Sequence, residues 1–161
     1  MTLDGGLSAD PLDILLKHDR WGTRRLLDVC EGLTAEQFQR RFDMGPGSLH
    51  DTLTHIIAAM RRWADRIAGR ELRPVIDVPS RHPDMPSDFK ARTPAELIAL
   101  LEPGADDLAA IAAEVRRPGG LGLGTVIEVQ FGKTLYRFTR GAALVHVATH
   151  GMHHRAQCLN M

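Results

Sequence analysis

Apolar side chains recur at three- and four-residue spacing in four parts of the chain, and this spacing predicts four helices. The first helix is expected over residues 11–31, where the series is Leu12, Leu15, Leu16, Leu26, Val29, Cys30 and Leu33. The second is expected over residues 48–69, where the series is Leu49, Leu53, Ile56, Ile57, Met60, Trp63, Ala64 and Ile67. The third covers about 93–117, and the fourth runs from about residue 140 to residue 161.

Residues with helix-capping chemistry support these bounds. Ser48 is a suitable N-cap for the second helix, and Gly32 and Gly69 predict the ends of the first two. The stretch 93–96, Thr-Pro-Ala-Glu, combines a cap, a first-turn proline and a capping-box glutamate. A second capping box at 34–37 predicts a short helical turn near Phe38.

Prolines and glycines predict where the helices are interrupted. Residues 70–92 contain four prolines, so we expect a long irregular crossover there. The pair Pro103–Gly104 predicts a kink or break in the third helix. Residues 125–131 and 134–139 flank Gly132–Lys133 and resemble a small hairpin. The pattern predicts one all-α domain, 1–161: a four-helix bundle with a crossover between helices two and three and a β-hairpin before helix four.

Composition and charge exclude several classes of function. Lys plus Arg and Asp plus Glu each number 20, so no basic excess points to nucleic acid. No apolar run reaches the roughly 18 residues of a membrane span. The start of the chain lacks the basic and apolar segments of a signal peptide, and two cysteines are too few for a disulfide framework. We therefore expect a cytoplasmic protein.

Four of the eight histidines lie within nine residues of the predicted last helix, at positions 146, 150, 153 and 154. At about 100° per residue, these four side chains share an arc of about 100°. Gln157 falls inside the same arc, whereas the apolar residues of this segment fall outside it. The fourth helix is therefore predicted to carry a face of imidazoles.

This face has two interpretations, a metal site or a set of solvated or hydrogen-bonded histidines. His150 and His154 are one helical turn apart, the spacing with which a helix offers two nitrogens to one metal ion. A third ligand must come from elsewhere, and the second helix offers His50 and His55. Periodicity alone slightly favours His50, which flanks the apolar stripe. More distant candidates are His18 and His82.

Two segments, SLHDTLTHIIAAMRRW (48–63) and HVATHGMHHRAQ (146–157), together resemble the DinB/YfiT-like family of metalloenzymes. The early HDRWGTRRLLD (18–28) and the helix order extend the likeness over nearly the whole chain. The family often has glutamate where Met60 stands here, and its last motif usually has glycine where Ala156 stands.

The resemblance implies a dimeric four-helix bundle that holds a divalent metal with three histidines. It points to His55 in the second helix, with His150 and His154 in the last, and so favours His55 over His50. Imidazole ligands suit zinc or nickel, which we expect first, and also iron or copper. Three neutral ligands leave an open coordination position, as in catalytic zinc sites.

Relatives imply an enzyme that uses such a metal to activate a small thiol, or water, against an electrophilic small molecule. The alternative is a non-catalytic, stress-linked bundle protein whose metal site is structural or vestigial. The remaining residues on the imidazole face, His146, His153 and Gln157, are candidates for orienting the ligands or transferring protons.

Four other side chains have less specific interpretations. Arg155 faces away from the imidazoles and suits a salt bridge or an interface, and Cys158 is a weaker candidate ligand. The aromatic residues Trp21, Trp63 and Tyr136 suit either a pocket wall or packing in the core and hairpin.

Overall fold

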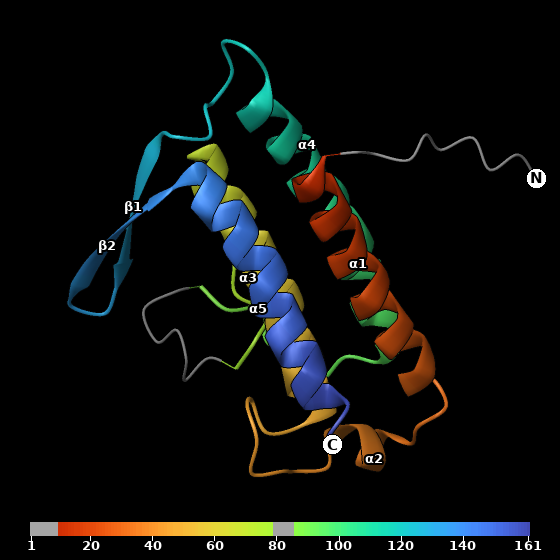
Figure 1. The fold of residues 1–161 in the computed structure, drawn as a ribbon. Helices are drawn as coiled ribbons and strands as arrows, with labels where there is room; N and C mark the ends of the chain where they lie inside the picture. The colour runs from red at the N-terminus through yellow and green to blue at the C-terminus, as the bar shows by residue number, and fades with distance from the viewer. Residues whose placement is uncertain (1–9, 79–85) are drawn as a thin grey trace, which may run out of the picture.

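The computed structural model describes residues 10–78 and 86–161. Four long helices form the bundle: α1 (Pro11–Cys30), α3 (Leu49–Ala68), α4 (Pro94–Arg116) and α5 (Arg140–Cys158). Each helix packs on two others, so that α1, α4, α3 and α5 follow one another around the bundle. In Figure 1, α3 and α4 run in one direction and α1 and α5 in the other. The predicted bundle is confirmed.

The helix ends follow the predicted capping chemistry. The Ser48 side chain accepts the backbone N–H of Asp51, and capping boxes start both α4 and the short helix α2 (Ala35–Gln39). At the end of α3, Gly69 adopts φ +71°, a left-handed conformation that favours glycine. The first helix ends at Cys30, just before the predicted stop.

Of the kink or break predicted at Pro103–Gly104, the break is wrong, because α4 continues through both residues. Proline costs this helix one backbone hydrogen bond, but buried apolar residues on both sides of it hold the helix against α1 and α3. Those residues are Leu97, Leu101, Leu108, Ile111 and Val115. Gly104 is buried, and a Cβ there would lie only 3.3 Å from Cγ of Arg61. Tertiary packing therefore outweighs the local helix-breaking preference.

The predicted hairpin is confirmed as β1 (Val126–Phe131) and β2 (Thr134–Thr139), paired antiparallel. Gly132 opens the two-residue turn with φ +56°. The hairpin projects from the bundle beside the start of α5 (Figure 1). Its aromatic side chains pack on α3. The buried ring of Trp63 on α3 lies 5.4 Å from Phe138 and 6.4 Å from Phe131. An isolated hairpin is marginal in water, so these contacts anchor it.

The core lies where the apolar stripe of α3 meets the other helices, and the stripe predicted for this helix is confirmed. All of its members are buried except Leu49, which is half-buried. The stripe predicted for α1 is only partly buried. Leu16, Leu27 and Cys30 face the core, but Leu15 and Val29 are exposed, Val29 by 70%.

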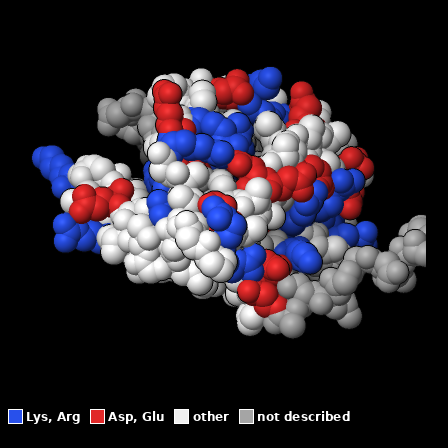
Figure 2. Space-filling view, turned by 90° about the horizontal axis from the view of Figure 1, so that it is seen from above, with Lys and Arg blue, Asp and Glu red and all other residues white. Residues whose placement is uncertain are grey.

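The described parts of the crossover between α3 and α4 contain no helix and no paired strand, as the prolines predict. Val75, Ile76 and Asp77 are buried against the bundle, and Val75 forms an isolated parallel bridge with Ser87. None of the described helices has both the length and the hydropathy of a membrane span. From above, acidic and basic side chains mix over much of the surface, and an uncharged area extends beside the hairpin (Figure 2).

Candidate metal centre

The histidine cluster, defined as His55, His150 and His154, joins α3 to α5. One ring nitrogen from each of the three lies within 4.8 Å of the other two, and all three side chains are half-buried. The rings of His55 and His150 are 5.0 Å apart, and those of His55 and His154 are 4.8 Å apart. Antiparallel packing of the two helices thus brings together residues about 95 positions apart in sequence.

A buried carboxylate orients His55. Oδ2 of Asp77 lies 3.0 Å from Nδ1 of His55, and a carboxylate at this position accepts the Nδ1–H. The lone pair of the His55 ring is then on Nε2, which faces His150. Arg62, seven residues after His55 on the same helix, donates from Nη1 to Oδ1 of Asp77 at 2.9 Å and balances the charge of this carboxylate. This pairing resembles the carboxylate–histidine pairs that support metal ligands.

An amide orients His154. Oε1 of Gln157 lies 2.7 Å from Nδ1 of His154 and accepts its N–H, which places the lone pair of this ring on Nε2. The loop before α3 makes room for the amide at Gly45, where φ is +50°. A Cβ at this glycine would lie 2.3 Å from Oε1 of Gln157. Gln157 therefore contacts the cluster through His154.

His150 completes the cluster from α5. Its Nε2 lies 3.2 Å from Nε2 of His55. Burial, followed by the neighbouring imidazoles of His55 and His154, lowers the pKa of His150 to about 3. The ring is therefore neutral at physiological pH, which is the form that ligates a metal.

The geometry and chemistry of the cluster fit a divalent ion. Nitrogens bound tetrahedrally at about 2.0–2.1 Å from a zinc ion lie about 3.4 Å from one another. The 3.2 Å between His55 and His150 is close to this value, and the 4.8 Å limit on the other pairs needs only small side-chain adjustments. Two of the three rings are also held through Nδ1, which places the lone pair of each ring on Nε2.

The other two imidazoles of the predicted face flank the cluster and are exposed. His146 lies one turn before His150, with ring centroids 5.6 Å apart, and it also contacts Trp63 at 5.1 Å. His153 receives a hydrogen bond at Nε2 from the amide of Gln157, at 3.2 Å. Both are therefore placed beside the cluster without being part of it.

His50 does not join the cluster, so the slight preference from periodicity was wrong. It is buried, its Nδ1 lies 2.9 Å from Asp51, and its Nε2 accepts the backbone N–H of Arg92 at 3.1 Å. Both ring nitrogens are used in structural hydrogen bonds. His18 is exposed on α1 beside Trp21, and His82 lies outside the described residues.

Arg155 forms the predicted salt bridge. It reaches α1, where its guanidinium pairs with the buried Asp19 and donates to Oγ1 of Thr23 at 3.2 Å. Gly151 permits this contact between α1 and α5, since a Cβ there would lie 2.0 Å from Oδ1 of Asp19. The pair fixes α5 on the side opposite the imidazoles.

The remaining candidates lie apart from the cluster. Cys158 is a buried free thiol whose pKa burial raises to about 12, which disfavours the thiolate that a metal requires. Trp21 is exposed on α1, Trp63 is buried under the hairpin, and Tyr136 is exposed on it.

Comparison with known families agrees with this arrangement. The sequence profile of the DinB family matches residues 9–161, which is nearly the whole chain. The chain belongs to the DinB family. A comparison with curated proteins finds no match.

The two departures from the usual DinB motifs, Met60 and Ala156, are not members of the histidine cluster. Met60 is fully buried and lines a small cavity with Leu16 and Leu108, on the side of α3 that faces α1 and α4. Ala156 is exposed on α5.

Sequence reasoning missed Asp77 and Arg62. Asp77 lies in the proline-rich crossover, where no periodicity assigns a direction to its side chain. The available signal was an aspartate directly after the apolar pair Val75–Ile76, which suggests a segment that turns inward. Arg62 lies seven residues after His55, about 20° away around the helix, so the helical wheel places both on one face.

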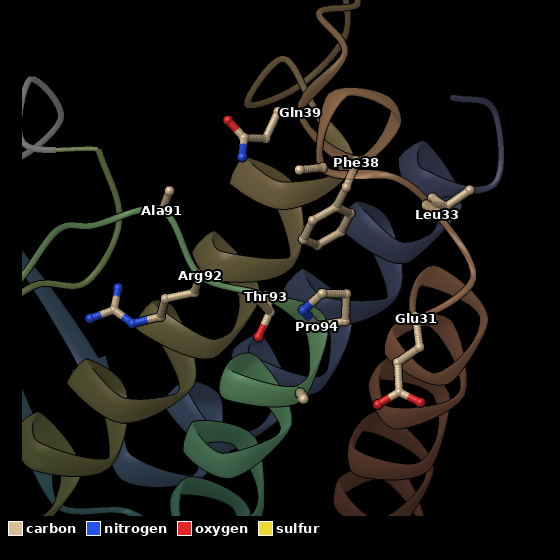
Figure 3. Close-up of a pocket in the computed structure, with 10 residues that line it drawn as sticks. Glu31, Leu33, Phe38, Gln39, Ala91, Arg92, Thr93 and Pro94 are labelled. Atoms are coloured by element: carbon tan, nitrogen blue, oxygen red, sulfur yellow. The ribbon is translucent and has the colours of Figure 1, made fainter.

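A separate cavity of about 480 Å³ lies at the end of the bundle near α2. Its lining residues include Phe38, Pro94 and Glu31. In Figure 3, Phe38 and Pro94 lie close together, and Glu31 extends from α1. The guanidinium of Arg92 extends away from the cavity and binds Asp88 and the carbonyl of Ile76. No histidine lines this cavity, so it is not part of the candidate metal centre.

Proposed function

We propose that this DinB chain is a metal-dependent enzyme that activates a small thiol, or water, against an electrophilic small molecule. The observation that carries the proposal is the convergence of three imidazoles from two helices, with Nδ1 of two of them already bonded. The group found among the described residues contains no carboxylate and no thiol. Three neutral ligands in a half-buried position are typical of an open, catalytic site.

A divalent ion bound there supplies Lewis acidity, which lowers the pKa of an adjacent thiol or water and favours the nucleophilic form. The residues of the chain position this chemistry. Asp77 and Gln157 hold the ligand rings, and the exposed imidazoles of His146 and His153 lie where they can accept or return a proton. Zinc or nickel suits three imidazoles, with iron or copper as alternatives.

Paired measurements on wild type and His150→Ala test the proposal. We expect the substitution to abolish metal binding and thiol turnover on a panel of electrophiles while the melting temperature changes little. The core and the helix caps lie outside the cluster, so folding does not depend on the ion. His18→Ala, which changes an exposed histidine on α1, is the matched control and should leave binding and turnover intact.

A structural metal site predicts the opposite result. Chelator would then lower the melting temperature of the wild type strongly, because metal-binding energy would be folding energy. Added thiol would not reach the ion, and no electrophile would be turned over. This combination would favour the non-catalytic alternative.

We also propose that the protein is a homodimer formed through the exposed face of α5. Its exposed positions repeat at alternating three- and four-residue spacing and carry no charge: Ala142, Val145, Thr149, Met152, Ala156 and Leu159. Met152 is 57% exposed and Leu159 is 75% exposed. This spacing is that of a helix seam, and symmetric dimers are the commonest soluble oligomers. We place the dimer in the cytoplasm, where the free thiols Cys30 and Cys158 remain reduced.

A further inference from the structure

Arg66 on α3 lies between two aromatic rings. Its Cζ is 5.4 Å from the ring of Trp63 and 5.4 Å from the ring of Phe131 on β1. Guanidinium groups stack favourably on aromatic faces, and such stacking leaves the N–H groups at the edge of the plane free to bind an acceptor. The contacts therefore hold this cation at the junction of the bundle and the hairpin.

No carboxylate within the described ranges neutralises Arg66, although three nearby arginines, Arg62, Arg70 and Arg73, are paired. Arg62 is held by Asp77, while Arg70 and Arg73 share Asp65 and Asp107. The side chain of Arg66 is half-buried and makes no ion pair or hydrogen bond with described residues. Burial, followed by repulsion from Arg62, lowers its pKa, with Asp65 acting in the opposite direction. An incoming anion would relieve this imbalance.

Arg66 lies on the same side of α3 as the histidine cluster. It follows His55 by eleven residues, which places the two about 20° apart around the helix. Side chains on a helix lean toward its N-terminus, so Arg66 leans toward His55. A chain of ring contacts also joins them, since Trp63 lies 5.1 Å from His146, and His146 lies 5.6 Å from His150.

The hairpin adds an apolar surface beside this cation. Phe131 and Tyr136 are 42% and 46% exposed, and their rings are 5.6 Å apart. Tyr136 in turn stacks on the half-buried Phe138 at 6.2 Å. Aromatic side chains that remain exposed next to an unpaired arginine suit a ligand with both an apolar part and an anionic group.

We infer that Arg66 binds the anionic end of an elongated substrate, most simply a carboxylate, whose reactive end reaches the histidine cluster along His146 and the hairpin aromatics. This inference rests on the proposed function, because it gives the substrate class of the same site. Arg66 is then a specificity-determining residue. The affinity for short or uncharged substrates should not depend on Arg66.

Thiol probes of different length and charge test the inference on cobalt-loaded protein, where a thiolate-to-metal absorption band reports binding. We expect mercaptoundecanoate to bind about tenfold more tightly than mercaptoundecanol, the scale of one charged hydrogen bond. Arg66→Met should remove this preference, and Arg66→Lys should retain part of it. Mercaptopropionate, which is too short to reach Arg66, should bind wild type and Arg66→Met alike.

Arg137→Met is the matched control, because Arg137 is an exposed arginine on β2 paired with Glu128. It removes the same charge near the hairpin and should leave the preference for mercaptoundecanoate unchanged. An acid preference that persists in Arg66→Met, or that Arg137→Met removes equally, would overturn the inference.

A second measurement on metal-free protein separates this inference from the proposed function. If no thiol produces the absorption band, the proposed function fails, but the anion site can still be tested through the fluorescence of Trp63. In a Trp21→Phe background, Trp63 is the remaining tryptophan. Phenylbutyrate should change its emission saturably, phenylbutanol should not, and Arg66→Met should abolish the response. Equal responses to the acid and the alcohol would overturn the inference.

Discussion

Oδ2 of Asp77 lies 3.0 Å from Nδ1 of His55, and this contact joins the crossover to the histidine cluster. The carboxylate is 1% exposed and holds the His55 ring with Nε2 toward His150 and His154. The crossover thus acts on the candidate metal centre without contributing a ligand.

Asp77→Asn should weaken metal binding about 10- to 100-fold, because the neutral amide no longer strengthens and orients the imidazole. Competition with a chromophoric chelator measures the affinity. Asp106→Asn is the matched control, since Asp106 is an exposed aspartate that pairs with Arg20 far from the cluster. Equal affinities for wild type and Asp77→Asn would show that the contact does not support a ligand.

His50 and His55 should respond oppositely to the same substitution, although both lie on α3. His55→Ala should abolish metal binding with little effect on folding. His50→Ala should leave metal binding intact and lower the free energy of unfolding by about 1–3 kcal/mol, because the buried N–H of Arg92 loses its acceptor. Metal titration and urea unfolding of the two variants check this, and loss of binding in His50→Ala alone would reverse the assignment.

The buried pair of Asp19 and Arg155 should matter for stability. Arg155→Met should lower the free energy of unfolding by about 3–5 kcal/mol, because it leaves an uncompensated carboxylate between α1 and α5. Adding Asp19→Asn removes that charge and should recover part of the loss. Denaturant unfolding of the single and double variants measures this coupling. A double variant no more stable than Arg155→Met would argue against it.

The proposed dimer should dissociate when charge enters the seam on α5. Met152→Glu should shift the mass from dimer to monomer, because burying two like charges across a symmetric interface is unfavourable. Light scattering over a range of concentrations measures the mass. Leu135→Glu is the control, because Leu135 is an exposed apolar residue on the hairpin and outside the seam. A monomeric wild type at all concentrations would contradict the proposal.

Local patterns predicted most of the fold because they record interactions within single elements. The stripe of α3 and the capping boxes depend on spacing along one helix, and the structure has both. The same holds for the shared face of His146, His150 and Gln157. Helix continuity at Pro103 was not predictable in this way, because contacts with other helices decide it.

The parts of the candidate site that escaped prediction depend on distant contacts. Periodicity could not choose between His50 and His55, and the structure separates them through the partners of their ring nitrogens: Asp51 and Arg92 for His50, Asp77 for His55. Exposure of Val29 on α1 likewise depends on which helices pack beside it, although its spacing fits the core series.

The most direct test of the central claim is the coordination of the ion in a structure of the metal-loaded, untagged protein. We expect one ion per chain, bound by Nε2 of His55, His150 and His154 at about 2.0–2.2 Å, with solvent at the remaining coordination position. A shell that contains His50 in place of His55, or a fourth protein ligand that closes the site to solvent, would contradict it.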